Sequence, residues 1–169
     1  MKKTLSILGL VVLMAGGLFA ATTQNVNMTV NLSAWYDLSV GTSSLTFTDV
    51  QPAISATPGT QAIAADEGAV AVRAFAITST GNTLKLNVVA NADLTAGSNT
   101  IGIGAITWTA SGSGYAGGTM AKTSVEAGSW TGSVLHWHEG TFTYSFLRNY
   151  ATQAPGAYTA TATYTLSAI

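Results

Sequence analysis

Strict alternation of apolar and polar side chains is the feature that most constrains this chain. Four stretches carry the alternation: 25–33, 84–88, 141–146 and 158–166. Side chains two residues apart share one face of a strand, so this period of two predicts strands with one buried face. No stretch carries apolar side chains at helical spacing over three turns.

Five further segments combine β-branched and aromatic residues and are expected to be strands: Trp35–Val40, 45–48, 70–79, 101–110 and 133–138. Clusters of glycine, proline, serine and asparagine separate the segments, and the glycine-rich stretch 111–118 is expected to be a flexible loop. Seven to nine short strands at this spacing predict an all-β fold, an antiparallel Ig-like or pilin-like β-sandwich.

The N-terminus has the layout of a secretory signal peptide. Lys2 and Lys3 precede an apolar run over 5–19, and the small residues Ala20 and Ala21 follow it. The alternative, a membrane anchor, needs about 20 apolar residues, and this run is shorter. We therefore expect a signal peptide over 1–20, one domain over 21–169, and a protein that is exported.

Charge and cysteine content exclude several functions. Removing residues 1–20 leaves four basic and seven acidic residues, a net charge of −3, which cannot build the basic surface that nucleic acid requires. The chain has no cysteine, so thiol catalysis, thiolate metal sites and disulfides are excluded. What remains is a structural or binding protein.

Few residues have the spacing of a catalytic or metal site. His136 and His138 share one strand face and could bind a metal together, but the carboxylates are scattered. We expect a solvent-facing histidine pair with Trp137 packed inward, and we predict no enzyme activity, no cofactor, no metal and no catalytic residue. The four tryptophans could form a sugar-binding face, but core packing is the interpretation we favour.

Both ends of the chain resemble a known family. The N-terminal strand 24–33 leads into 38–42 and 45–50, and the C-terminus runs through 154–160 into 161–166, with Gly156 at its start. These segments resemble the spore-coat-U-like domain and the pilin subunits of archaic chaperone–usher fimbriae. The chain departs from that family in lacking its paired cysteines, and Trp35 stands about where the first would fall.

The resemblance implies a function and partners. In such families a sandwich that lacks one strand accepts an N-terminal strand from the next subunit, so copies join head to tail. Here the donor would be residues 21–33, with Val26, Met28, Val30 and Leu32 as anchors. A periplasmic chaperone and an outer-membrane usher are the further partners implied, with passage through the periplasm to a cell-surface fimbria or secretion.

The expected function is therefore that of a non-enzymatic subunit of a surface fibre or fimbria. Two alternatives are a monomeric secreted adhesin or carbohydrate-binding sandwich, and an envelope hydrolase or metal-binding protein using the two histidines. The C-terminal strand is expected to lie centrally in the core, beside Phe47 and Phe75. Its contributing residues are Gly156, Tyr158, Tyr164 and Leu166.

Overall fold

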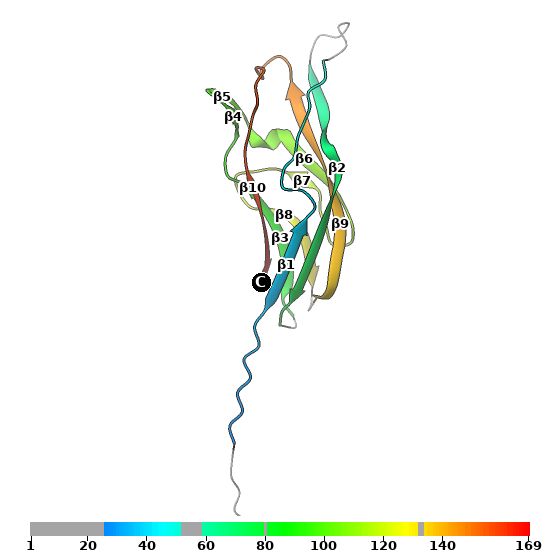
Figure 1. Ribbon diagram of the computed structural model, residues 1–169, viewed down its shortest axis with the longest axis vertical. Coiled ribbons are helices and arrows are strands. Elements are labelled where there is room, and N and C mark those ends of the chain that lie inside the picture. The colour runs from blue at the N-terminus through cyan, green and yellow to red at the C-terminus, as the bar shows by residue number, and fades with distance from the viewer. Residues whose placement is uncertain (1–25, 52–58, 80, 132–133) are drawn as a thin grey trace, which may run out of the picture. The chain divides into compact units, whose positions relative to one another are not determined.

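The chain folds as an antiparallel β-sandwich in a computed structural model that describes residues 26–51, 59–79, 81–131 and 134–169 (Figure 1). The predicted all-β class is confirmed. Seven of the strands in these ranges have six or more residues, and three have two or three. The described residues contain no helix long and apolar enough to cross a membrane. The expected signal peptide lies outside these ranges.

The larger sheet has five strands in the order β1-β2-β9-β6-β7. Its strands are β1 (Trp35–Val40), β2 (Thr60–Ile77), β9 (Val134–Asn149), β6 (Ile106–Ser111) and β7 (Gly118–Thr119). The long strands β2 and β9 pair along most of their length, with register shifts between Ala64 and Ala69 and between Ala74 and Ala76. Among the described strands, β1 lies at an edge of this sheet and pairs with β2 alone.

The smaller sheet has three strands in the order β10-β3-β8. Its strands are β10 (Ala162–Ala168), β3 (Thr83–Ala90) and β8 (Val125–Thr131). A separate two-stranded ladder joins β4 (Leu94–Ala96) to β5 (Asn99–Ile101), and a single 3-10 turn, η1 (Ile103–Ala105), precedes β6.

The core lies between the two sheets and follows the predicted alternation. In β3, Leu84, Leu86 and Val88 are buried while the residues between them are half-buried. In β9, Phe142 and Tyr144 are buried and Thr143 between them is exposed. These strands have one face on the core, so the apolar positions of the two-residue period are the ones whose side chains pack between the sheets.

The C-terminal strand occupies a different place from the one expected. The strand β10 begins at Ala162 and, within the described part of the chain, pairs with β3 alone, so it is an edge strand rather than a central one. Tyr158 precedes it in the chain. Phe75 is on the outer face of β2, between the buried Ala74 and Ala76, and packs against Trp137 with ring centroids 5.3 Å apart.

The glycine-rich stretch 111–118 is anchored rather than flexible. Tyr115 inserts from it toward the core, and its hydroxyl donates to the carbonyl of His138 (2.8 Å) with the carbonyl of Val72 3.2 Å away. Gly114 has a φ of +83°, and a Cβ there would collide with the Trp130 indole. The glycines therefore allow a tight turn that places one aromatic ring between the sheets.

Contacts divide the chain into two units after Asn31, one ending there and the other running from Leu32 to Ile169. In the first unit only residues 26–31 are described. They have no strand assignment, and the whole stretch 26–34 is exposed. The expected strand with one buried face is therefore not formed within the described part of a single chain.

Candidate strand-binding groove

An apolar groove of about 1000 Å³ opens along the sandwich between two segments that are far apart in sequence. One side is formed by residues 42–47, which follow β1, and the other by residues 154–162, which lead into β10. Large aliphatic and aromatic side chains from the larger sheet, the β4–β5 ladder, the η1 turn and the segment after β7 line the interior: Ile63, Leu94, Ile101, Ile103, Ile106, Met120 and Phe146.

The first side of the groove has backbone groups without partners among the described residues. Thr46 faces β2: its N–H donates to the Glu67 carboxylate at 3.0 and 3.1 Å, and its carbonyl accepts the Asp66 N–H at 2.9 Å. Successive residues of an extended chain direct their backbone groups to opposite sides. Those of Leu45 and Phe47 therefore face away from β2, and they form no hydrogen bond with other described residues.

The second side repeats this arrangement. Thr159 exchanges two 3.1 Å backbone bonds with Thr95, and the carbonyl of Thr161 accepts the N–H of Asn91 at 2.8 Å. Tyr158 and Ala160 alternate with these residues, and their backbone N–H and C=O groups have no partner in the described ranges. The groove is thus bordered by two strand-like edges with unpaired donors and acceptors, the arrangement that accepts an added strand.

Two adjacent carboxylates hold the first side in place. Besides the contact of Glu67 with Thr46, the Asp66 carboxylate accepts the Thr48 hydroxyl at 2.6 Å. The pKa of Glu67 is lowered, chiefly because the Thr46 N–H donates to the ionised carboxylate. Both acids lie at the register shift in β2. The irregular backbone there lets the side chains of two consecutive residues, Asp66 and Glu67, both reach residues 46–48.

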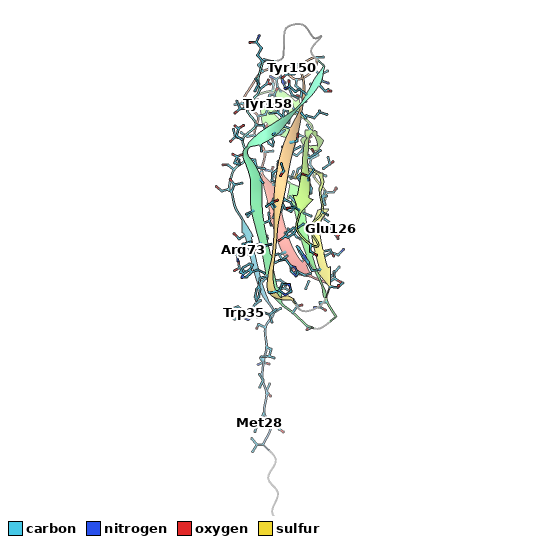
Figure 2. The ribbon with its side chains drawn as sticks, turned by 90° about the vertical axis from the view of Figure 1, so that its right-hand side faces the viewer. Met28, Trp35, Arg73, Glu126, Tyr150 and Tyr158 are labelled. Carbon is cyan, nitrogen blue, oxygen red and sulfur yellow. The ribbon has the colours of Figure 1, made fainter. Side chains whose placement is uncertain are left out.

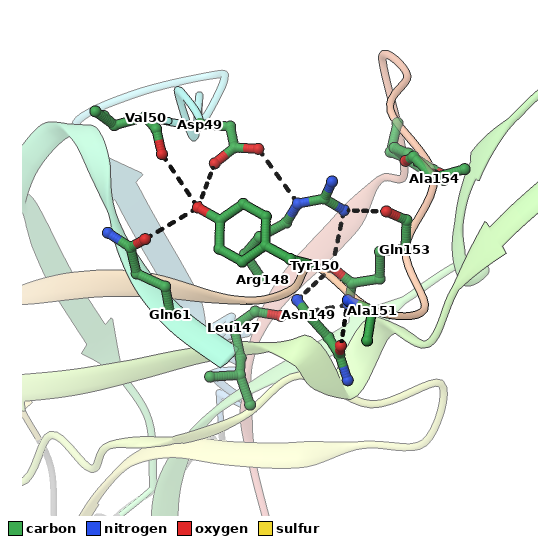
Figure 3. A network of polar contacts seen from close by, with 11 residues as sticks. Asp49, Val50, Gln61, Leu147, Arg148, Asn149, Tyr150, Ala151, Gln153 and Ala154 are labelled. Atoms are coloured by element: carbon green, nitrogen blue, oxygen red, sulfur yellow. Dashed lines mark hydrogen bonds and ion pairs between the residues drawn. The ribbon is translucent and has the colours of Figure 1, made fainter. Parts of the chain in front are cut away.

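A polar network lies at one end of the groove, around Asp49 and Arg148 (Figure 3). The buried Arg148 donates to Asp49 at 3.2 Å and to the carbonyl of Gln153 at 2.7 Å. The Tyr150 hydroxyl donates to Asp49 (2.9 Å), and Gln61 lies 2.9 Å from the same hydroxyl. These contacts tie residues 49–50 to the end of β9 and to the turn that precedes residues 154–162.

The predicted C-terminal residues lie on the groove or close to it. Gly156, Tyr158 and Tyr164 line it, and Tyr158 donates to the carbonyl of Ala154 at 3.0 Å. Leu166 packs against the core further along β10. The three large side chains are half-buried: Tyr164 and Leu166 lie on the edge strand β10, and Tyr158 lies in the segment that leads into it.

The predicted donor residues, in contrast, are largely exposed to solvent. Val26, Met28, Val30 and Leu32 expose between 71 and 91% of their surface, and Met28 is labelled in Figure 2. Large apolar side chains at this exposure are unfavourable in water unless a partner covers them. The chain therefore carries an uncovered apolar segment with period two and, in the other unit, an uncovered groove.

The histidine pair is oriented differently from the expectation. His138 points toward the core and stacks on Trp130 at 4.8 Å, while Trp137 is on the outer face with Phe75. Burial and the neighbouring His136 lower the pKa of His138, which disfavours the charged imidazolium. The two rings are 4.7 Å apart, but no group of three or more metal-ligating side chains occurs in the described residues.

The tryptophans divide into two pairs. Trp108 and Trp130 are buried, and their indole nitrogens each donate to a carbonyl at 2.8 Å, so the core interpretation is right for them. Trp35 is 68% exposed and Trp137 is half-buried. Both line a smaller hollow on the outer face of the larger sheet.

Sequence reasoning missed the acids that hold the first border and the polar end of the groove. Asp66 and Glu67 are adjacent acids in an otherwise neutral stretch, and Asp49 is a single acid before a loop. The first border itself has a sequence signal, because Leu45 and Phe47 alternate with threonine as in a strand. The partners of these acids, Thr46, Thr48 and Arg148, come from other parts of the chain and carry no sequence signal.

In comparisons with known proteins, no family model, no curated protein and no solved structure matches this chain.

Proposed function

We propose that the protein is a non-enzymatic structural subunit of a surface fibre or fimbria, in which residues 26–32 of one copy fill the groove of the next. The observation that carries the proposal is the pair of groove borders with unpaired backbone groups. A strand placed between them would bond to Leu45 and Phe47 on one side and to Tyr158 and Ala160 on the other.

The segment and the groove match in length and polarity. Seven extended residues span about 23 Å, and the groove borders of six and nine residues span about 20 to 30 Å. The four apolar side chains of the segment share one face and would enter the aliphatic interior. Each contributes about 1.5–3 kcal/mol when fully buried.

Polymerisation of the chain with one residue changed tests the proposal. Val30→Asp places an unpaired carboxylate on the buried face of the donated strand, and Asn31→Asp places the same charge on the opposite face. We expect the unchanged chain and Asn31→Asp to form filaments in electron micrographs and ladders in size-exclusion chromatography, and Val30→Asp to remain monomeric.

A synthetic peptide spanning residues 23–33 adds a direct measurement. It should bind the Val30→Asp protein, whose groove is unfilled, and Val30→Asp in the peptide should weaken binding about 100-fold or more, or by about 3 kcal/mol. Equal effects of the changes at positions 30 and 31 would contradict the alternating geometry. A monomeric unchanged chain that binds no peptide would contradict the proposed function itself.

A further inference from the structure

Exposed large apolar side chains collect at the two ends of the sandwich. Outside residues 26–32, those found in the described ranges are Trp35, Tyr36, Ile77 and Ile169 at one end and Val50 and Leu147 at the other. Trp35 pairs with Ile77, and Ile169 bonds to Thr83 beside them. Figure 2 labels Trp35 at one end of the strands and Tyr150, which bonds to the carbonyl of Val50, at the other.

The first end, which we call the aromatic end, extends onto the outer face of the larger sheet. Trp35, Phe75 and Trp137 border a hollow of about 250 Å³ there. The Arg73 guanidinium lies 4.7 Å from the centre of the Trp137 ring and pairs with Glu139 at 3.1 Å. Monomeric proteins rarely leave several large aromatic and aliphatic side chains uncovered together.

Chain length limits where the aromatic end of a donor subunit can lie. Only Ser33 and Ala34 separate Leu32 from Trp35, and three residue steps span at most about 11 Å. If Leu32 is seated in a neighbouring groove, Trp35 of the donor therefore lies within about 11 Å of it. The two subunits must touch at this place.

The end of the groove at which the donor leaves follows from the borders. Toward Val40 and Tyr164 the groove runs into the contact between β1 and β10. At its other end lie Asp49 and Ala154, beside the exposed Val50. The donor body has to remain outside the acceptor, so Leu32 is placed at the Asp49 end and Val26 toward Val40.

We propose that the aromatic end of one subunit packs on Val50 and Leu147 of the subunit whose groove it fills, which gives the fibre a second apolar contact. The occupant of the aromatic end is thus a second copy of this chain. This inference rests on the proposed function. It accounts for the exposed apolar residues at both ends by one head-to-tail contact.

Cross-linking within fibres tests the contact, and the absence of native cysteines gives a clean background. The double variant Trp35→Cys with Val50→Cys is polymerised and treated with a bismaleimide that spans about 10 Å, comparable to the reach set by three residues. The control pair is Trp35→Cys with Thr143→Cys, because Thr143 is exposed on the outer face of β9 away from both ends. We expect a ladder of linked subunits for the first pair and at least tenfold less linking for the control.

Bending of the fibres gives a second readout. Trp35→Ser combined with Ile77→Thr changes only exposed positions, so the fold should persist, and fibres should form with a persistence length at least threefold shorter. Fibres with equal cross-linking for the two pairs, or with unchanged bending, would overturn this inference and leave the proposed function intact. A neutral oligosaccharide that binds the fibres and requires Trp35 would also overturn it, whereas failure of the unchanged chain to form fibres would remove both proposals.

Discussion

The hydroxyl oxygens of Tyr144 and Tyr164 lie 2.5 Å apart and connect the two sheets where they line the groove. Tyr144 belongs to β9 and Tyr164 to β10, and burial raises the pKa of both phenols. Both therefore stay protonated at physiological pH, and one donates to the other. This contact joins the edge strand β10 to the larger sheet.

Removing this hydroxyl contact and removing the ring should have separable costs. We expect Tyr164→Phe to lower the free energy of unfolding by about 1 kcal/mol, the usual net value of a hydrogen bond. Tyr164→Ala also removes the ring stacked on Phe142, with centroids 6.1 Å apart, and should cost about 3 kcal/mol. Urea denaturation measures both, and equal losses for the two variants would show that the ring contributes nothing.

The polar end of the groove should depend on Asp49. We expect Asp49→Ala to destabilise the fold by about 1 kcal/mol, because the buried Arg148 loses a charged partner that is itself partly exposed. The Gln61→Ala variant removes only one contact of the Tyr150 hydroxyl and serves as the control. Thermal unfolding compares them, and a larger loss for Gln61→Ala would contradict the assigned importance of the ion pair.

The attachment of residues 42–47 to β2 should weaken in acid. Folding lowers the pKa of Glu67, so its contribution to stability is present above the unfolded pKa of about 4.3 and is lost as the pH falls through the folded value. Glu67→Gln removes this dependence. Unfolding measured from pH 7 to pH 2 should show the unchanged chain more stable near neutrality, with the difference shrinking as the pH falls below the unfolded pKa. A difference that is constant with pH would contradict the role given to the charge.

Proline substitutions distinguish the two kinds of backbone position at the second border. The N–H of Ala160 has no partner in the described chain, so Ala160→Pro should leave unfolding nearly unchanged and prevent a strand from pairing there. The N–H of Thr159 bonds to Thr95, so Thr159→Pro should destabilise the fold. Circular dichroism and binding of the 23–33 peptide check both, and normal peptide binding by Ala160→Pro would place the donated strand elsewhere.

Periodicity predicted the strands that have one face on the core, but it also predicted strands at 26–33 and 45–48, which have no strand assignment. The segment Trp35–Val40 is a strand with the expected bounds, and Phe142 and Tyr144 point inward as their alternation with threonine indicates. The same parity, continued toward the N-terminus of β9, directs His138 inward and Trp137 outward. The sequence does not show that 133–138 and 141–146 belong to one strand, so the parity of the second segment cannot be carried to the first.

Position within a sheet could not be read from the sequence. The C-terminal strand has the alternation of a buried strand, but whether it has one neighbour or two depends on the path of the rest of the chain. The sequence also does not show which face of the sheet carries Phe75, because both faces of β2 carry apolar residues near its end. The groove itself needs two segments more than 100 residues apart, and no local pattern encodes their approach.

The uncovered segment and the uncovered groove belong to the same chain, and this has a consequence for any assembly that joins one to the other. A row of such subunits would have a vacant groove at one tip and an unused segment at the other. The two tips would therefore differ chemically, and growth, capping and attachment could each be confined to one of them. A molecule that terminates the row would need only one of the two parts, either the segment or the groove.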